Sequence, residues 1–180
     1  MSTFKVDRSF PLSKLKLNNL TRETLTHKVS FRINPGNNMN DYSTSSSNIN
    51  ANNVFDLNRL GISNDFEAGR SITIGLDYKY DQIENTLSED TKDEYLEFKL
   101  ATVIRDQNEN DIPTSSTINR KNSNLFGSIN TRLFNTLDFV YNFSLDNDMK
   151  TIHSNSIETA ISINNFVTSF TFIEQRNDIS

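Results

Sequence analysis

The chain has 180 residues, of which only 34% are hydrophobic, and its formal net charge is −5 at neutral pH. No apolar run approaches the roughly 20 residues that a spanning helix needs, which excludes a helical membrane protein but not a membrane β-barrel. The chain contains no cysteine, so a disulfide framework and a thiolate metal site are excluded as well.

The first predicted strand covers residues 24–33, where apolar and polar side chains alternate. Because successive side chains point to opposite faces of a strand, Val29 and Phe31 are expected on an apolar face and Ser30 and Arg32 on a polar one. Residues 1–23 give no clear strand. The lysines and arginines of residues 1–32 are interpreted as ordinary solvated surface, so no nucleic-acid partner is expected.

A long polar loop is predicted for residues 34–65, followed by a strand at residues 66–80. Within it, residues 34–53 contain Pro35-Gly36 and a run of Ser and Thr at residues 43–47, a composition that argues against a packed core there. Loops of this length are uncommon in compact domains, whereas barrels carry them on their extracellular side.

Five further strands are predicted at residues 94–105, 124–133, 137–146, 150–163 and 166–175, with a second long polar loop at residues 106–123. The clearest alternation is in 137–146, whose odd positions are Leu137, Phe139, Tyr141, Phe143 and Leu145. Ten residues of tilted strand rise about 25 Å, which is the height of the apolar band of an outer-membrane barrel.

We therefore predict a single domain over residues 1–180, an all-β antiparallel meander that forms part of a transmembrane outer-membrane β-barrel, as an incomplete barrel wall. The alternation of long and short connections fits such a barrel. A soluble β-sandwich binding module, in which the apolar rows pack on each other, is the alternative that composition alone favours.

No motif indicates an enzyme. The two histidines, His27 and His153, are too few for a histidine metal cluster. The acidic stretch at residues 106–111 lacks the glycine and the final glutamate of a calcium loop. Nucleophile-elbow, phosphate-loop and dinucleotide patterns are also missing. We expect no catalytic residue, cofactor or metal.

Residues 53–78 and the stretch around Pro113 resemble the barrel domain of the LPS-assembly protein family, LptD, also called organic solvent tolerance protein. The resemblance extends over about residues 24–174. The positions that carry it are Phe55, Asn58, Arg59, Gly61, Asp65, Gly69, Gly75, Tyr78 and Pro113.

The resemblance implies a location in the cell outer membrane and a role in inserting lipopolysaccharide (LPS) into the outer leaflet. It also implies an LptE-type lipoprotein plug, periplasmic bridge proteins that dock on a domain outside these residues, and a signal peptide in a full-length precursor. A segment of another barrel, such as a porin, is the alternative. The apolar faces would contact lipid, and the polar faces would line a wet lumen through Lys79, Lys99, Arg105, Arg132 and Glu158.

Overall fold

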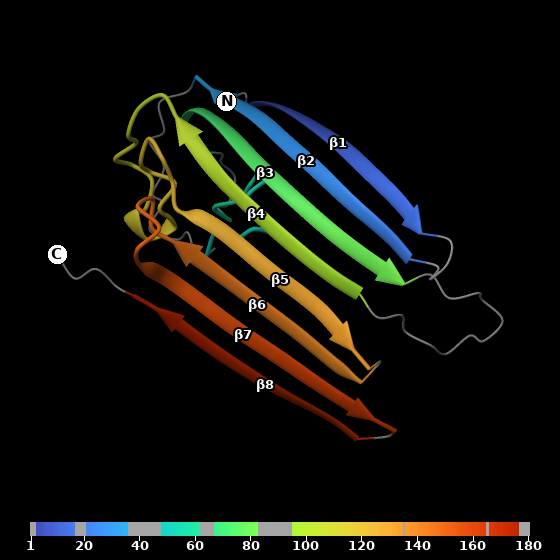
Figure 1. Cartoon of the computed structure of the whole chain (residues 1–180). Helices are drawn as coiled ribbons and strands as arrows, with labels where there is room; N and C mark the ends of the chain where they lie inside the picture. The colour runs from blue at the N-terminus through green and yellow to red at the C-terminus, as the bar shows by residue number, and fades with distance from the viewer. Residues whose placement is uncertain are drawn as a thin grey trace.

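The computed structural model describes residues 3–16, 21–35, 48–61, 67–82, 95–134, 136–164 and 166–176. In this part of the chain, eight antiparallel strands form one sheet in sequence order (Figure 1). The strands are β1 (Phe4–Lys16), β2 (Thr21–Asn34), β3 (Gly69–Gln82), β4 (Tyr95–Arg105), β5 (Leu125–Leu133), β6 (Leu137–Leu145), β7 (Ile152–Ile163) and β8 (Phe166–Gln175). The sheet is open, with β1 and β8 at its edges, which confirms the predicted meander and its incomplete barrel wall.

One register row crosses all eight strands and is apolar throughout. We call it the outer row; it consists of Leu12, Leu25, Tyr78, Phe98, Ile129, Tyr141, Ile157 and Phe172. The neighbouring row, one residue further along each strand, is polar at every position except Val140. We call it the inner row; it consists of Ser13, Thr24, Lys79, Glu97, Asn130, Val140, Glu158 and Thr171. Because a shift of one residue moves a side chain to the opposite face, the sheet has one apolar and one polar face.

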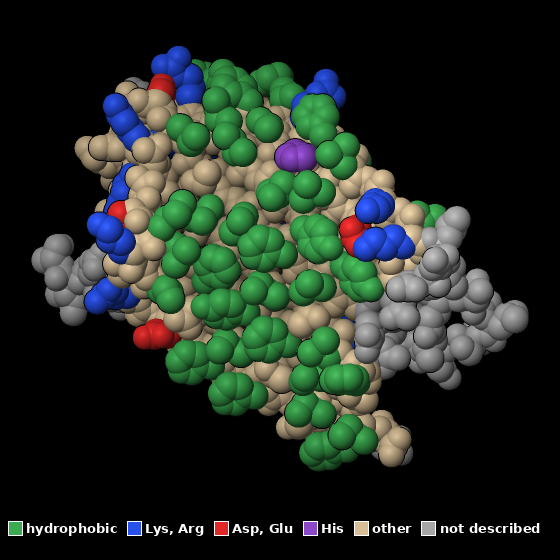
Figure 2. Space-filling model, in the orientation of Figure 1, with side chains coloured by type: hydrophobic (Ala, Val, Ile, Leu, Met, Phe, Trp, Pro, Cys, Tyr) green, Lys and Arg blue, Asp and Glu red, His purple; other side chains and the backbone are tan. Residues whose placement is uncertain are grey.

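The apolar face is open to the surroundings. Ile72 is 40% exposed, Ile74 45% and Phe170 63%, values that a dry interior between two packed sheets would not allow. Figure 2 shows this face, where hydrophobic side chains spread across the sheet and charged side chains gather toward its margins. In the described residues there is no second layer over it, so the arrangement differs from that expected for a β-sandwich.

Strand β1 was not among the predicted strands. It pairs with β2 along its whole length, although its pattern is irregular, because Pro11 interrupts it and the register places Leu15 with the polar positions. Proline lacks a backbone N–H and is tolerated at the edge of a sheet, which is where β1 lies.

Residues 48–61 form a turn-rich segment that packs on the polar face, behind the sheet in Figure 1. Its buried side chains Ile49, Ala51, Val54 and Leu60 meet the apolar inner-face positions of β4 and β5 and two residues of the β4–β5 connection, namely Ala101, Val103, Phe126, Ile112 and Ile118. The expectation that residues 34–53 hold no packed core was therefore wrong at Ile49 and Ala51, which belong to this cluster. A few apolar residues suffice there because they join one cluster with the apolar inner-face positions of β4 and β5.

No helix in the described part of the chain is long and apolar enough to cross a membrane.

Candidate functional site

The inner face, defined here as the face that carries the inner row and residues 48–61, holds several ion pairs between described residues and a buried group of charged side chains. Near the β1–β2 and β3–β4 connections it carries a charge ladder, in which each cation lies beside a carboxylate. The ladder pairs are Lys28–Asp77, Arg22–Asp81 at 3.1 Å, Lys79–Asp81 at 2.9 Å, Lys99–Glu97 at 3.1 Å and Arg132–Asp138 at 2.6 Å. The inner face is thus strongly polar there, while its positive charges are largely neutralised by neighbours.

The register places Lys79, Lys99, Arg132 and Glu158, all predicted to line a lumen, on this inner face. Lys79 is exposed, with 48% of its side chain accessible, while the guanidinium of Arg132 lies 5.5 Å from the centre of the Tyr95 ring. Arg105, the fifth predicted residue, lies on the same face but is buried beneath the loops.

Arg105 belongs to an arginine cluster, which consists of Arg32, Arg59, Arg105 and Glu67. Their side chains are between 0% and 4% exposed. Glu67 accepts hydrogen bonds from Arg59 Nε at 2.6 Å, from Arg32 Nη1 at 2.8 Å and from Arg105 Nη2. The cluster therefore ties β2, the 48–61 segment, the approach to β3, and β4 together at one point.

Three arginines around one carboxylate leave an excess of positive charge in a dry site, which is costly unless hydrogen bonds compensate it. Backbone carbonyls and hydroxyls provide them. Arg59 donates to Val54 O at 3.2 Å, Thr73 Oγ1 at 3.0 Å and Ser71 Oγ at 3.2 Å. Arg105 Nη1 donates to Ala68 O at 3.0 Å. Burial lowers the pKa of Arg59 to about 9, so its guanidinium stays protonated at neutral pH.

The residues of the family resemblance gather around the same segment. Gly75 lies under Phe55, because a Cβ at this position would meet the Phe55 ring at 2.6 Å and the Leu100 carbonyl at 3.1 Å. Gly69 opens β3 with a φ of +83°, and Gly61 ends the segment with a φ of +64°. Both values are in the left-handed region that glycine adopts without strain.

The remaining family positions are more scattered. Asn58 lies in the same segment, where its carbonyl accepts a hydrogen bond from Gly61 N at 3.1 Å. Tyr78 is in the outer row, and Pro113 precedes a short 3₁₀ turn at Thr114–Ser116. Asp65 lies outside the described residues.

Neither Glu67 nor the burial of Arg32 was predicted from the sequence. Alternation identifies the polar face of a strand, but it does not distinguish an arginine that faces water from one that another segment covers. The sequence did contain one signal for the cluster. Glu67 is two residues before Gly69 and lies in the same stretch as Arg59, and both Gly69 and Arg59 are positions of the family resemblance. In the described residues, no group of three or more His, Asp or Glu side chains is placed to hold a metal ion.

In the comparison with known proteins, a family model described as LptD, LPS transport system D, matches residues 1–180 of the chain. No curated protein matches it.

Proposed function

Because the chain belongs to the LptD family, we propose that it forms part of the barrel wall of the outer-membrane translocon that inserts LPS into the outer leaflet. The family acts in LPS transport and resides in the outer membrane, and its model matches the whole chain. The proposal goes further, since it gives this stretch of wall a lipid-facing side and a side that the transported LPS passes.

The observation that carries the proposal is the contrast between the outer and inner rows. A charge facing lipid at the bilayer midplane costs about 2–4 kcal/mol, and the outer row contains none across eight strands. The inner row instead presents Lys79, Glu97 and Glu158, side chains that require water or polar partners. A wall between hydrocarbon and a wet lumen satisfies both faces.

The proposed partners come from membership of the LptD family, and the two faces of the sheet suggest where each would lie. LPS would pass along the inner face, where the charge ladder offers cations to its phosphates and carboxylates to its hydroxyls. An LptE-type lipoprotein would occupy the remaining lumen. The periplasmic bridge proteins would be a further partner of the translocon.

The test places a photo-crosslinking amino acid at one of two adjacent β3 positions in the complete translocon: Lys79 on the inner face or Tyr78 in the outer row. We expect the inner probe to capture LPS while transport runs and to lose it when the bridge proteins are depleted. The outer probe, which contacts the bilayer, should capture membrane lipid in both conditions. An inner probe that never captures LPS would contradict the proposal and favour another kind of barrel.

A further inference from the structure

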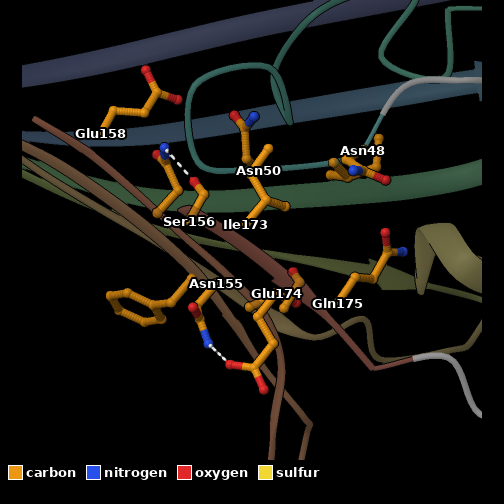
Figure 3. A pocket seen from close by; sticks show the side chains of 13 residues that line it. Asn48, Asn50, Asn155, Ser156, Glu158, Ile173, Glu174 and Gln175 are labelled. Carbon is orange, nitrogen blue, oxygen red and sulfur yellow. Dashed lines mark hydrogen bonds between the residues drawn. The ribbon is translucent and has the colours of Figure 1, made fainter. Parts of the chain in front are cut away.

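A polar pocket lies on the inner face, apart from both the charge ladder and the arginine cluster. It has a volume of about 180 Å³ and lies between the start of the 48–61 segment and strands β6, β7 and β8 (Figure 3). In Figure 3, Asn48 and Asn50 of the segment lie across from Ser156, Ile173 and Gln175 of the strands. The side chains used in the argument below are Asn50, Asn142, Ser154, Ser156, Glu158 and Gln175.

The lining is rich in hydroxyl and amide groups and has no cation. Among the described residues that line the pocket, the charged ones are Glu158 and Glu174, and none is a lysine or arginine. The register places Glu158 on the inner face, whereas Glu174 is on the opposite face and accepts a hydrogen bond from Asn155 there. A phosphate in the pocket would therefore meet a carboxylate of its own sign and no cation. An acyl chain would leave hydroxyls and amides without partners, at a cost in free energy. A neutral ligand with many hydroxyls fits the lining best.

One acceptor in the pocket wall is unused. Asn142 donates from Nδ2 to Ser156 Oγ at 3.3 Å, whereas its Oδ1 is buried and has no hydrogen-bond partner within the described structure. Buried acceptors without a donor are uncommon in proteins. A ligand hydroxyl that reaches this wall would supply the missing donor.

The side of the pocket formed by the start of the 48–61 segment is held in place by contacts within the protein, without a ligand. Ile49 is 6% exposed and belongs to the core. Asn50 Oδ1 accepts from the backbone N–H groups of Asn52 at 2.9 Å and Asn53 at 3.2 Å. Further along the same segment, Arg59 anchors it to Glu67. A preformed wall lowers the ordering cost of binding.

The position of the pocket along the strands indicates which part of a glycolipid it would meet. Ser154 and Gln175 lie at the end of the sheet that carries the connections 35–68, 106–124 and 146–151, and the charge ladder lies toward the end with connections 17–20, 83–94, 134–136 and 164–165. Barrels place their longer loops outside the cell. The pocket is thus near the extracellular end of the proposed wall.

We propose that this pocket binds a neutral sugar ring of the outer saccharide of LPS, and not the phosphorylated sugars next to the lipid. Its volume is below the roughly 300–1,000 Å³ of pockets for drug-sized ligands, which suits one ring at a time. This inference rests on the proposed function, because it assumes that LPS passes along the inner face.

The first test compares crosslinking probes at Ser156 in the pocket and at Lys79 in the charge ladder, in the complete translocon. Cells make either full-length LPS or LPS truncated before its neutral hexoses. We expect Ser156 to capture only the full-length form and Lys79 to capture both. Equal capture of both forms at Ser156, or capture at Lys79 alone, overturns the proposal that the pocket binds a neutral sugar and leaves the proposed function intact. Capture at neither position overturns both.

The second test measures binding of a dephosphorylated, deacylated core oligosaccharide to the detergent-solubilised translocon. Ser156→Leu fills the pocket and should weaken binding by about tenfold or more, as expected for the loss of one or two hydrogen bonds. The matched control is Thr159→Leu, which places the same side chain on the opposite face of β7 and should leave binding unchanged. Unchanged binding by a folded Ser156→Leu protein overturns the proposal.

Discussion

Glu67 is the carboxylate that three buried guanidinium groups share, and its contribution depends on what its removal leaves behind. Arg32, Arg59 and Arg105 are almost fully buried. Hydrogen bonds to neutral carbonyl oxygens give their N–H donors partners, but these carbonyls supply no negative charge to balance the guanidinium groups. The cluster is therefore expected to be the strongest attachment between the 48–61 segment and the strands.

We predict that Glu67→Gln destabilises the folded chain by about 3–5 kcal/mol, because it leaves buried arginines without their counter-charge. Urea unfolding of the chain in lipid vesicles measures the change in the free energy of unfolding. The matched control is Glu97→Gln, which removes a partly exposed ion pair with Lys99 and should cost less than about 1 kcal/mol. Similar decreases in the free energy of unfolding for the two variants would show that the cluster contributes no more stability than a surface ion pair.

The close approach of the Phe55 ring to Gly75 leads to a second prediction about single residues. A methyl group at Gly75 would overlap the Phe55 ring and approach the Leu100 carbonyl. Gly75→Ala should therefore cost about 1–3 kcal/mol through overpacking.

The double variant Gly75→Ala/Phe55→Leu identifies the cause of that loss. A smaller side chain at residue 55 makes room for the methyl group, so the double variant should be less destabilised than the sum of the two single variants. Additive losses in the same unfolding measurement would mean that the backbone of β3, and not the ring, resists the substitution.

At the scale of elements, alternation predicts the faces of a strand well because it reports on the two environments that the strand separates. In β6, the odd positions Phe139 and Tyr141 are apolar and take part in the apolar face, as their pattern indicates. In β1 the same rule gives no answer, because Pro11 and Leu15 break the pattern. Pairing with β2 overrides that weak local signal.

The 48–61 segment shows why part of the candidate site was beyond prediction. Composition describes the average polarity of a stretch, and residues 34–53 are very polar. The packing depends instead on a few residues, such as Ile49 and Val54, that meet the apolar positions Val103 and Phe126 from other strands. Such a match between distant segments is not encoded in any local period.

A pair of adjacent substitutions in β6 tests the assignment of the two faces. Tyr141 is in the outer row and Val140 in the inner row. Tyr141→Arg should destabilise the chain in lipid vesicles by about 2–4 kcal/mol, as expected for a cation at the bilayer midplane. Val140→Arg should be tolerated, because the register pairs it with Glu158. The assignment fails if Val140→Arg is the more destabilising variant.

At the scale of the whole molecule, the sheet has two kinds of unsatisfied surface. The outer row exposes hydrocarbon and aromatic groups, and the edges at β1 and β8 leave backbone donors and acceptors without partners in the described sheet. All ten residues of β8 are exposed. Either surface promotes association in water, the first by burial of apolar area and the second by strand pairing.

We therefore predict that the 180-residue chain aggregates in aqueous buffer, which sedimentation or size-exclusion chromatography would detect. A mild detergent separates the two causes, because it covers the apolar face but does not hydrogen-bond to a strand edge. If the apolar face dominates, detergent should yield a monomer with β-sheet circular dichroism. If the edges dominate, the chain should stay oligomeric in detergent, and Thr171→Lys, on the polar face of the edge strand β8, should reduce that association. A soluble monomer with a sharp thermal transition in buffer alone would contradict a wall that contacts lipid, since its apolar rows would then have to be buried within the protein.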